Sequence, residues 1–184
     1  YTTEERKPYS YFLDPMMERI GQFFKDEGMT RPAVVIEPGR SIVGEAGITL
    51  YTVGSIKDIR GVRKYVSVDG GMTDNIRPAL YQAVYDGVIA NKAEEAKEEV
   101  VTICGKCCES GDILIRDIAV PSPEAGDTFA IFSTGAYGYS MASNYNKNGI
   151  PAVVFVKEGK SALTVKRQTM DDLIRNEIIP DSMA

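Results

Sequence analysis

Apolar residues recur at helical spacing early in the chain and then form a short continuous run. Asp14 and Pro15 have the residue types of a helix N-cap and a first helical position. They precede a helical repeat of apolar residues that ends at Gly28 (Met16, Met17, Ile20, Phe23 and Phe24). This repeat predicts an amphipathic helix. Residues 33–36, Ala-Val-Val-Ile, are typical of a buried parallel strand. Together the two segments predict one helix–strand step of an α/β fold.

The pattern changes after residue 40 to many short stretches rich in Val, Ile, Thr and Phe, with glycines at the turns between them. The predicted strands are residues 48–53, 64–68, 100–104, 112–120, 128–132, 152–156 and 161–165. Short strands at this spacing predict a β sandwich or a β barrel. The expected fold is therefore mainly β, with residues 1–40 as an α/β remnant and residues 41–184 as a β domain.

Helical stretches interrupt the predicted strands. We expect two short ones, over residues 76–84 and residues 140–144. Thr169 and Asp172 have the spacing of a capping box, in which each side chain bonds a backbone N–H at the start of a helix. A terminal helix is therefore expected after Thr169.

Composition narrows the classes of function. Of the 184 residues 26% are charged, the formal net charge is −5, and no run of Lys or Arg stands out. A nucleic-acid partner is therefore not expected, since phosphate binding needs a basic face. No apolar run approaches the roughly 20 residues of a membrane span, so no membrane partner is expected.

Three cysteines, Cys104, Cys107 and Cys108, lie close together and do not form a usual disulfide framework. A reducing, cytoplasmic setting fits them best. The Cys104-x-x-Cys107 spacing leaves redox chemistry open. A structural zinc site needs four ligands, and the chain has neither a histidine nor a second cysteine pair, so no metal is expected.

Four strings could carry chemistry, and the first is Glu37-Pro38-Gly39-Arg40, directly after the predicted buried strand. Residues at the C-terminal end of a parallel strand lie where barrel active sites form. Gly39 would let backbone N–H groups approach an anion, and Arg40 offers a fork of donors to a carboxylate or phosphate. The alternative is a surface turn with a solvated arginine.

The second string contains Arg77 and Tyr81, which are four residues apart. On a helical turn they would face the same way, and a guanidinium beside a phenol can clamp a carboxylate. The alternative is an exposed arginine packed on a tyrosine ring. Pro78 places Arg77 at the edge of the helix and leaves the shared face open.

The third string is Cys108-Glu109-Ser110-Gly111-Asp112, in a predicted loop between strands. A thiol beside a carboxylate can transfer a proton and bind a cation, although a buried, inert cysteine in a turn is the alternative. The fourth string, residues 135–146, is dense in Gly, Tyr and small polar residues and includes Tyr137. It could present hydroxyls and amides to a phosphate, or be a loop with packed tyrosines.

In this order the four strings resemble the pyridoxal-phosphate-dependent decarboxylases that join a (β/α)8 barrel to a β domain. The third string, together with residues 140–146, resembles the diaminopimelate branch. The ornithine and arginine branch typically has aspartate where this chain has Glu109. The resemblance covers nearly the whole chain and implies decarboxylation of meso-2,6-diaminopimelate to L-lysine and carbon dioxide, in lysine biosynthesis.

The resemblance also implies a role for each candidate residue. The pyridoxal-phosphate-binding residues would be Glu37, Pro38, Gly39, Arg40 and Tyr137. The substrate-binding residues would be Arg40, Arg77, Tyr81, Glu109 and Tyr137. Cys108 would be the catalytic proton donor.

The chain departs from the family pattern in its N-terminal part. The family's cofactor-binding lysine in a Lys-Ala-Asn context, its barrel histidine and its glycine-rich phosphate loop are all absent. Only about forty residues precede the β region, whereas a complete barrel needs about 250. We therefore expect residues 1–40 to be the last helix–strand step of the barrel, in a fragment that is inactive alone.

The intact enzyme is expected to be a homodimer with shared active sites, in which the loop of Cys108 and Glu109 reaches into the barrel of the partner. Two alternatives remain open. One is a related decarboxylase acting on ornithine or arginine, and the other is a non-catalytic β module that mediates dimerisation.

Overall fold

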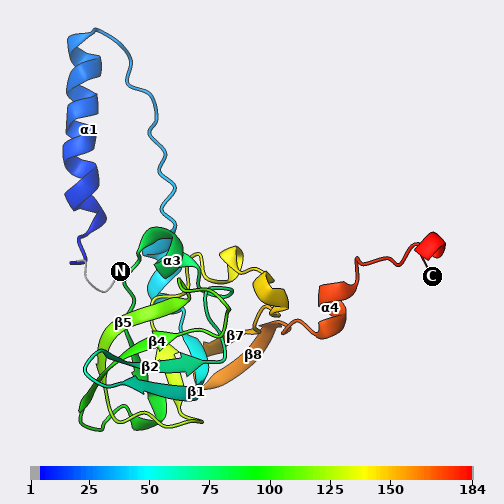
Figure 1. Cartoon of the computed structure of the whole chain (residues 1–184). Helices are drawn as coiled ribbons and strands as arrows, with labels where there is room; N and C mark the ends of the chain where they lie inside the picture. Colours follow the sequence, from blue (N-terminus) through cyan, green and yellow to red (C-terminus); the bar gives the residue numbers. More distant parts are fainter. Residues whose placement is uncertain (1–4, 184) are drawn as a thin grey trace.

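The computed structural model describes residues 5–183, and its body is a mixed six-stranded sheet (Figure 1). The strand order is β3-β6-β1-β2-β4-β5. Only β2 and β4 pair in parallel, and the other neighbours are antiparallel. The strands are β1 (Thr49–Ile59), β2 (Arg63–Val68), β3 (Gly87–Ile89), β4 (Glu99–Cys104), β5 (Ile113–Val120) and β6 (Thr128–Ile131).

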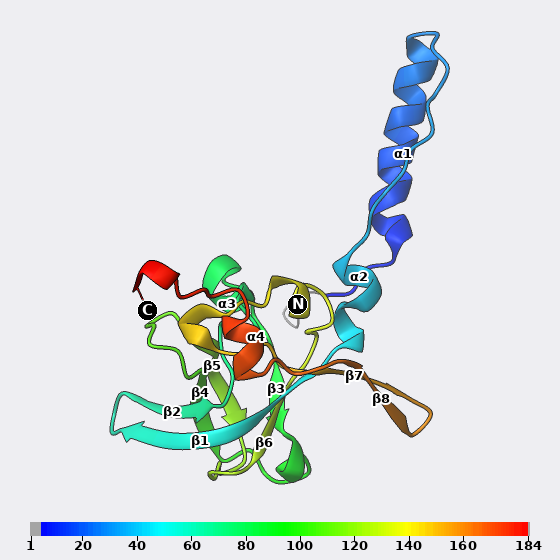
Figure 2. The same cartoon turned by 90° about the vertical axis from the view of Figure 1, so that its right-hand side faces the viewer.

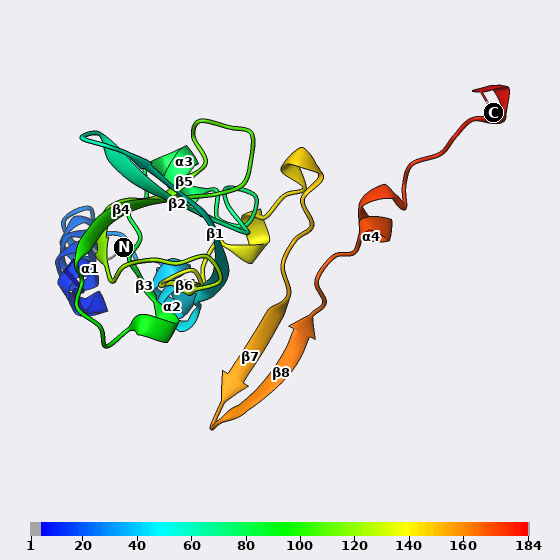
Figure 3. The same cartoon turned by 60° about the horizontal axis from the view of Figure 1, so that its bottom comes forward.

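The long strand β1 joins the two halves of this sheet. Its first part, from Thr49 to Thr52, pairs with β6, and its later part, to Ile59, pairs with β2. The register with β2 shifts between Val53 and Ile56. Such a bulge bends a strand and increases its twist, and the sheet curls round into a nearly closed, barrel-like form (Figure 3). The predicted mainly β barrel is thus confirmed.

The core lies inside this curled sheet. Phe129 and Ile131 of β6 have no exposed surface, and Val101 and Ile103 of β4 are 1% exposed. Val101 and Ile103 are two residues apart and so share the face toward the core, as the pleat requires. Thr102 between them is also buried, whereas Val100 is 62% exposed.

Strand β3 was not predicted. It is only three residues long and begins with Gly87, whose backbone lies against β6. A Cβ on Gly87 would stand 2.5 Å from the carbonyl oxygen of Ala130 and 2.8 Å from the Phe129 ring. A glycine thus permits the close approach of the two backbones, although glycine within a sequence argues against a strand.

The N-terminal helix α1 (Tyr9–Asp26) is longer than predicted. A start at Asp14 was wrong, since the helix begins after Pro8 and Pro15 lies inside it. The end is confirmed, because Gly28 adopts a left-handed φ of 66° just after the helix.

Residues 33–36 do not form the predicted buried strand. Within the described part of the chain they are extended without pairing, and Val35 is 85% exposed. A buried parallel strand needs neighbours on both edges and layers on both faces. Figure 1 shows α1 and the chain that follows it standing away from the sheet, where the described residues supply neither.

The chain passes from this arm into α2 (Arg40–Val43) and the 3-10 turn η1 (Gly44–Ala46). Of the predicted stretch 76–84, only α3 (Arg77–Tyr81) is helical, because Gln82 has a left-handed φ of 55°. The predicted helix at 140–144 is replaced by two 3-10 turns, η3 (Tyr139–Met141) and η4 (Tyr145–Lys147). A further 3-10 turn, η2 (Ala90–Lys92), follows β3.

The C-terminal part is a second arm (Figure 2). It contains the β7–β8 hairpin (Val153–Lys157 and Lys160–Val165), α4 (Met170–Ile174) and η5 (Asp181–Met183). The capping box of α4 is confirmed, since the Asp172 N–H donates to Thr169 Oγ1 and the Thr169 N–H donates to the Asp172 carboxylate. No helix among residues 5–183 is both long and apolar enough to cross a membrane.

Candidate functional site

Two arginines and two tyrosines from three distant segments lie together above one end of the sheet. The guanidinium carbon of Arg77 lies 4.7 Å from the ring centroid of Tyr81 and 5.1 Å from that of Tyr137. The guanidinium carbon of Arg40 lies 5.9 Å from the Tyr137 ring. These distances suit cation–π contacts. The shared face predicted for Arg77 and Tyr81 is confirmed, and Tyr137 contacts both arginines.

Gly39 makes room for the Tyr137 hydroxyl. A Cβ at position 39 would stand 2.5 Å from this oxygen, closer than real contacts allow. Tyr137 itself has a left-handed φ of 62°, which is uncommon for a residue with a side chain. Tyr137, a predicted site residue, therefore packs against Gly39 of the first string while its own backbone is strained.

The segments of Arg40 and Tyr137 are joined by a close crossing of glycines. The Gly135 N–H donates to the Gly44 carbonyl at 3.0 Å, and the Thr134 N–H donates to the Gly47 carbonyl at 3.0 Å. A Cβ on Gly47 would stand 2.3 Å from the Gly135 Cα. Only glycine fits such a crossing, and the crossing brings the first and fourth strings together.

The loop before Arg77 is built on a buried carboxylate. Asp74 accepts hydrogen bonds from the Gly71 N–H at 3.0 Å, from Thr73 Oγ1 and from the buried Tyr51 hydroxyl. Burial raises the pKa of Asp74, and burial followed by the nearby Asp74 charge raises the pKa of Tyr51. Because these groups are buried and mutually hydrogen-bonded, they fix the loop that leads into α3.

The Cys108 loop lies beside this one. The Cys108 N–H donates to Asn146 Oδ1 at 3.1 Å, and the Cys108 side chain is exposed. The Glu109 carboxylate accepts from Ser110 Oγ and from the Gly111 N–H, both at 3.4 Å. Residues 108–111 of the third string therefore form an exposed turn that carries a thiol and a carboxylate on consecutive residues.

Asp112, which sequence reasoning gave no role, anchors this turn. Its carboxylate is 3% exposed and accepts from the Met72 N–H at 2.6 Å and the Cys107 N–H at 2.7 Å. A Cβ on Gly105 would stand 2.2 Å from one carboxylate oxygen, so this position also needs glycine. Asp112 therefore ties the Cys108 loop to the loop that leads to Arg77. In the sequence, only the position of Asp112 at the end of the third string pointed to this anchoring role.

The fourth string connects the remaining parts. Arg77 Nη1 donates to Met141 Sδ at 3.7 Å, and the Ser143 N–H donates to the Thr73 carbonyl at 2.8 Å. Asn146 bonds Cys108 as described above. The segment thus runs from the arginine–tyrosine cluster to the thiol loop. Met141 and Asn146 were not predicted as site residues, because their residue types alone indicate no chemistry.

Burial also affects the other two cysteines. Burial, and then the charge of Asp112, raises the pKa of both Cys104 and Cys107. Cys107 receives a weak hydrogen bond from Asn148 Nδ2 at 3.7 Å, and Cys104 donates to the Val66 carbonyl at 3.6 Å. Both groups are thus held as thiols in separate surroundings. In the described part of the chain, no three His, Cys, Asp or Glu side chains form a metal-binding group.

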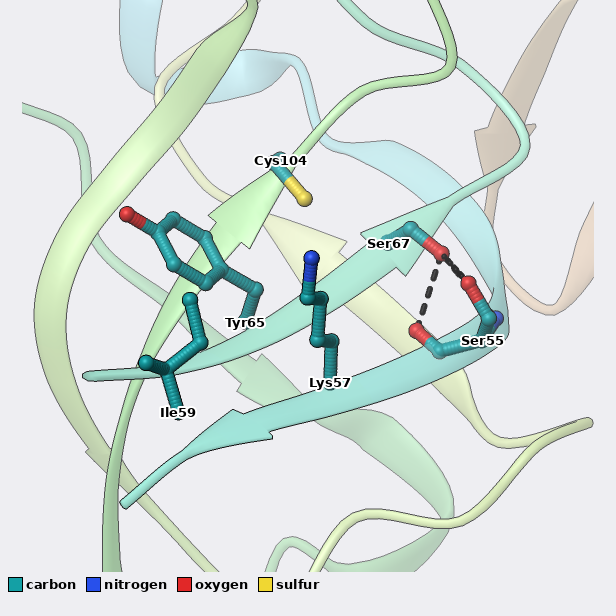
Figure 4. A pocket seen from close by; sticks show the side chains of 6 residues that line it. All are labelled: Ser55, Lys57, Ile59, Tyr65, Ser67 and Cys104. Atoms are coloured by element: carbon teal, nitrogen blue, oxygen red, sulfur yellow. Dashed lines mark hydrogen bonds between the residues drawn. The ribbon is translucent and has the colours of Figure 1, made fainter. Parts of the chain in front are cut away.

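A hollow lies elsewhere, on the surface of the sheet. It has a volume of about 310 Å³ and lies on the face of β1, β2 and β4, with Lys57 and Cys104 pointing into it (Figure 4). The other lining residues are Ser55, Ile59, Tyr65 and Ser67. None of the predicted site residues lines it, so the candidate site is the cluster around Tyr137.

The cluster fits an anionic group such as the phosphate of the implied cofactor. Two guanidinium groups and a phenol supply donors and positive charge, and Gly39 lets the Tyr137 hydroxyl lie close to the backbone before Arg40. Glu37 is exposed and Pro38 half-buried, on the extended chain that leads into α2. The structure thus brings together Gly39, Arg40, Arg77, Tyr81 and Tyr137.

Over nearly its full length, the chain is similar to known proteins. It is 52% identical over 178 residues to a diaminopimelate decarboxylase of Bacillus subtilis and 51% identical over 175 residues to one of Staphylococcus aureus. These alignments cover 96% and 95% of this chain, but 40% and 41% of the relatives. The chain therefore spans about two fifths of the length of these curated relatives.

Solved structures agree with the fold. A crystal structure of diaminopimelate decarboxylase from M. jannaschii matches all of this chain and 41% of its own, with 36% identity and a TM-score of 0.87. The enzyme from Helicobacter pylori, complexed with L-lysine, matches 96% of this chain and 41% of its own, with 31% identity and a TM-score of 0.81.

A family model also matches residues 9–135, more than half of the chain. It describes the C-terminal sheet domain of pyridoxal-dependent decarboxylases. The barrel-like sheet, the arginine–tyrosine cluster and the Cys108 loop all include residues of this range. The chain belongs to the family of pyridoxal-dependent decarboxylases and carries their C-terminal sheet domain.

Proposed function

We propose that this chain is part of a pyridoxal-phosphate-dependent decarboxylase that converts meso-2,6-diaminopimelate to L-lysine and carbon dioxide. The observation that carries the proposal is that Tyr137 lies near both Arg40 and Arg77, and that Tyr81 also lies near Arg77. Relatives about half identical to this chain are diaminopimelate decarboxylases. The third string, with Glu109 beside Cys108, favours this branch over an ornithine or arginine enzyme.

Substrate recognition would follow from charge. Diaminopimelate has a carboxylate and an ammonium group at each end, so its binding needs both cations and an anion. Arg77 and Tyr81 would hold the distal carboxylate, since a planar guanidinium matches a carboxylate and the phenol donates a hydrogen bond. Glu109 would accept from the distal ammonium group. Arg40 and Tyr137 would contact both substrate and cofactor.

Pyridoxal phosphate, when bound, supplies the electron sink that makes loss of carbon dioxide possible. The residues of this chain would orient the cofactor and keep its phosphate in place. Glu37, Pro38, Gly39, Arg40 and Tyr137 are the proposed cofactor-binding residues. Cys108 would donate the proton from its Sγ to the carbon atom that loses the carboxylate, which defines it as the catalytic residue of this chain.

The two parts of this site would belong to different subunits of a homodimer. Cys108 and Glu109 lie on an exposed turn, and the former contacts Asn146. We propose that this turn enters the barrel of the partner, and that residues 1–40 belong to the barrel, with residues 41–184 as the β domain. The exposed apolar side chains of α1, such as the 59% exposed Phe12, support burial against further barrel residues. The three free cysteines fit a cytoplasmic enzyme.

The test uses the protein expressed from its complete reading frame. Purified enzyme with added pyridoxal phosphate should release lysine and carbon dioxide from meso-diaminopimelate, and Cys108→Ala should lose most of this activity. The 184-residue chain alone should be inactive. Ornithine, arginine and lysine serve as control substrates. Turnover of one of these in place of diaminopimelate would contradict the proposal.

Mixed dimers test the shared site. Cys108→Ala and Arg77→Ala subunits, each inactive alone, would be co-expressed with different tags so that the heterodimer can be purified. A shared site predicts that one of the two sites in each heterodimer is intact, with about half of the wild-type activity. A heterodimer as inactive as its parents would mean that each subunit builds its own complete site.

A further inference from the structure

The consecutive backbone N–H groups of Cys107 and Cys108 are held by side chains from two different segments of the chain. Asp112 Oδ2 accepts from the Cys107 N–H at 2.7 Å, and Asn146 Oδ1 accepts from the Cys108 N–H at 3.1 Å. The exposed thiol of Cys108 lies at the tip of this turn. Because the thiol has one rotatable bond beyond its Cα, the backbone decides where the sulfur can reach.

We infer that Asn146 is a positioning residue that fixes the backbone of Cys108 and so directs its thiol, an inference that rests on the proposed function. The Cys107 N–H fixes the peptide plane before Cys107, and the Cys108 N–H fixes the plane between Cys107 and Cys108. The two bonds together set the position of the Cys108 Cα, from which the side chain starts. Asp112 supplies one fixed point from within the same loop. Asn146 supplies the second from a segment 38 residues further along the chain.

The segment of Asn146 is itself held firmly. Asn146 has a left-handed φ of 53°, a conformation that asparagine tolerates better than most residues. The side chain of Asn144 donates to the Asn148 carbonyl at 2.8 Å and to Gln168 Oε1 at 2.6 Å. Asn148 in turn donates to Cys107 Sγ at 3.7 Å. The turn therefore contacts the Cys108 backbone through Asn146 and the Cys107 thiol through Asn148.

The same segment also reaches the other half of the candidate site. Met141 contacts Arg77, and Ser143 bonds Thr73, in the loop before Arg77. In the proposed dimer Asn146 would therefore connect the proton donor, which acts in the site of the partner, to the arginine–tyrosine cluster of its own subunit. Without the hydrogen bond between Asn146 and the Cys108 N–H, the loop would no longer hold the thiol in one position. Misplacement of a reacting group by about 1 Å can cost about a hundredfold in rate.

Two variants at this exposed position separate positioning from stability. Asn146→Gly removes the acceptor and still permits the left-handed backbone. Asn146→Asp keeps an oxygen acceptor and is also compatible with that backbone. Both are made in the full-length enzyme, with hydrogen exchange measured at the Cys107–Glu109 amides and kinetics measured on diaminopimelate.

We expect Asn146→Gly to speed exchange of the Cys108 amide and to lower kcat by about tenfold to a hundredfold, with little change in KM. Its kcat should also show a larger solvent deuterium isotope effect, because a misplaced thiol makes proton donation slower than the other steps. Asn146→Asp should behave like the wild type in all three measurements. A purely structural role would not move the isotope effect.

Equal kinetic losses in both variants, or a wild-type kcat in Asn146→Gly, would overturn the inference. An unchanged exchange rate of the Cys108 amide in Asn146→Gly would overturn it whatever the substrate. If the wild-type enzyme releases no lysine from diaminopimelate, the proposed function fails, and the exchange rates still decide whether Asn146 holds the Cys108 backbone.

Discussion

The Tyr137 hydroxyl occupies the space that a Cβ of residue 39 would need, because the two positions are 2.5 Å apart. The side chain at position 39 thus controls the position of the ring that contacts Arg40 and Arg77. We expect Gly39→Ala to displace this ring and to weaken binding of pyridoxal phosphate by about tenfold, the effect of losing roughly one good contact. Fluorescence titration of the full-length apoenzyme measures the affinity.

Removal of the hydroxyl offers an internal control for this prediction. In a Gly39→Ala, Tyr137→Phe double variant the new methyl group would meet the ring carbon Cζ at 3.4 Å, an acceptable contact. The double variant should therefore bind the cofactor no worse than Tyr137→Phe alone. Additive losses would show that the Gly39→Ala effect does not pass through Tyr137.

Arg77 and Tyr81 provide a second prediction. The Arg77 guanidinium lies close to the rings of both Tyr81 and Tyr137, and lysine has no planar group to offer them. We expect Arg77→Lys to raise KM for diaminopimelate by about tenfold or more, since it loses a bidentate contact to the distal carboxylate. Steady-state kinetics of the full-length enzyme measure this change. The control is Arg116→Lys, at an exposed position of β5.

The pattern of the sequence predicted the strands of the sheet well, because each long strand alternates or clusters its apolar residues. Val101 and Ile103 are an example, since both face the core as the short apolar stretch indicates. The pattern failed where structure depends on distant partners. Residues 33–36 have the composition of a buried strand, but the described residues offer no strand to pair with them.

The candidate site also contains contacts that the sequence predicts and contacts that it does not. The stacking of Arg77 on Tyr81 follows from a spacing of four residues and was predictable. The contact of Tyr137 with both arginines depends on the crossing of Gly47 and Gly135, which are far apart in sequence. The anchoring role of Asp112 depends on amides of two loops that only the fold brings together. No local pattern encodes such contacts.

A third prediction concerns pH and the ion pair between β2 and β4. The hydrogen bond from Lys64, and then that from Ser122, lowers the pKa of Glu99 below its usual 4.5. A carboxyl whose pKa is lowered in the folded state stabilises the fold above its unfolded pKa, and this stabilisation is lost as the pH falls through the folded pKa.

Glu99→Gln should therefore lower the free energy of unfolding at pH 7 by about 1 kcal/mol or less, as is usual for a pair near the surface. At a pH below the lowered pKa of Glu99 the wild type and the variant should be equally stable, since Glu99 is then protonated in both states. Urea denaturation at both pH values measures the difference, and Glu98→Gln controls for the loss of one charge. A difference that persists at low pH would contradict the assigned role of the Glu99 charge.

The fourth prediction uses two neighbouring valines of β4 to test which side chain of this strand faces the core. Val101 is 1% exposed and packs in the core, whereas Val100 is 62% exposed. Val101→Ala removes buried methyl groups and leaves a cavity, so it should lower the free energy of unfolding by about 2 kcal/mol. Val100→Ala makes the same chemical change on the outer face and should cost less than about 0.5 kcal/mol. Denaturant unfolding of the two variants compares them directly. Equal losses would mean that the outer face of β4 is also buried in the intact protein, against another part of the enzyme.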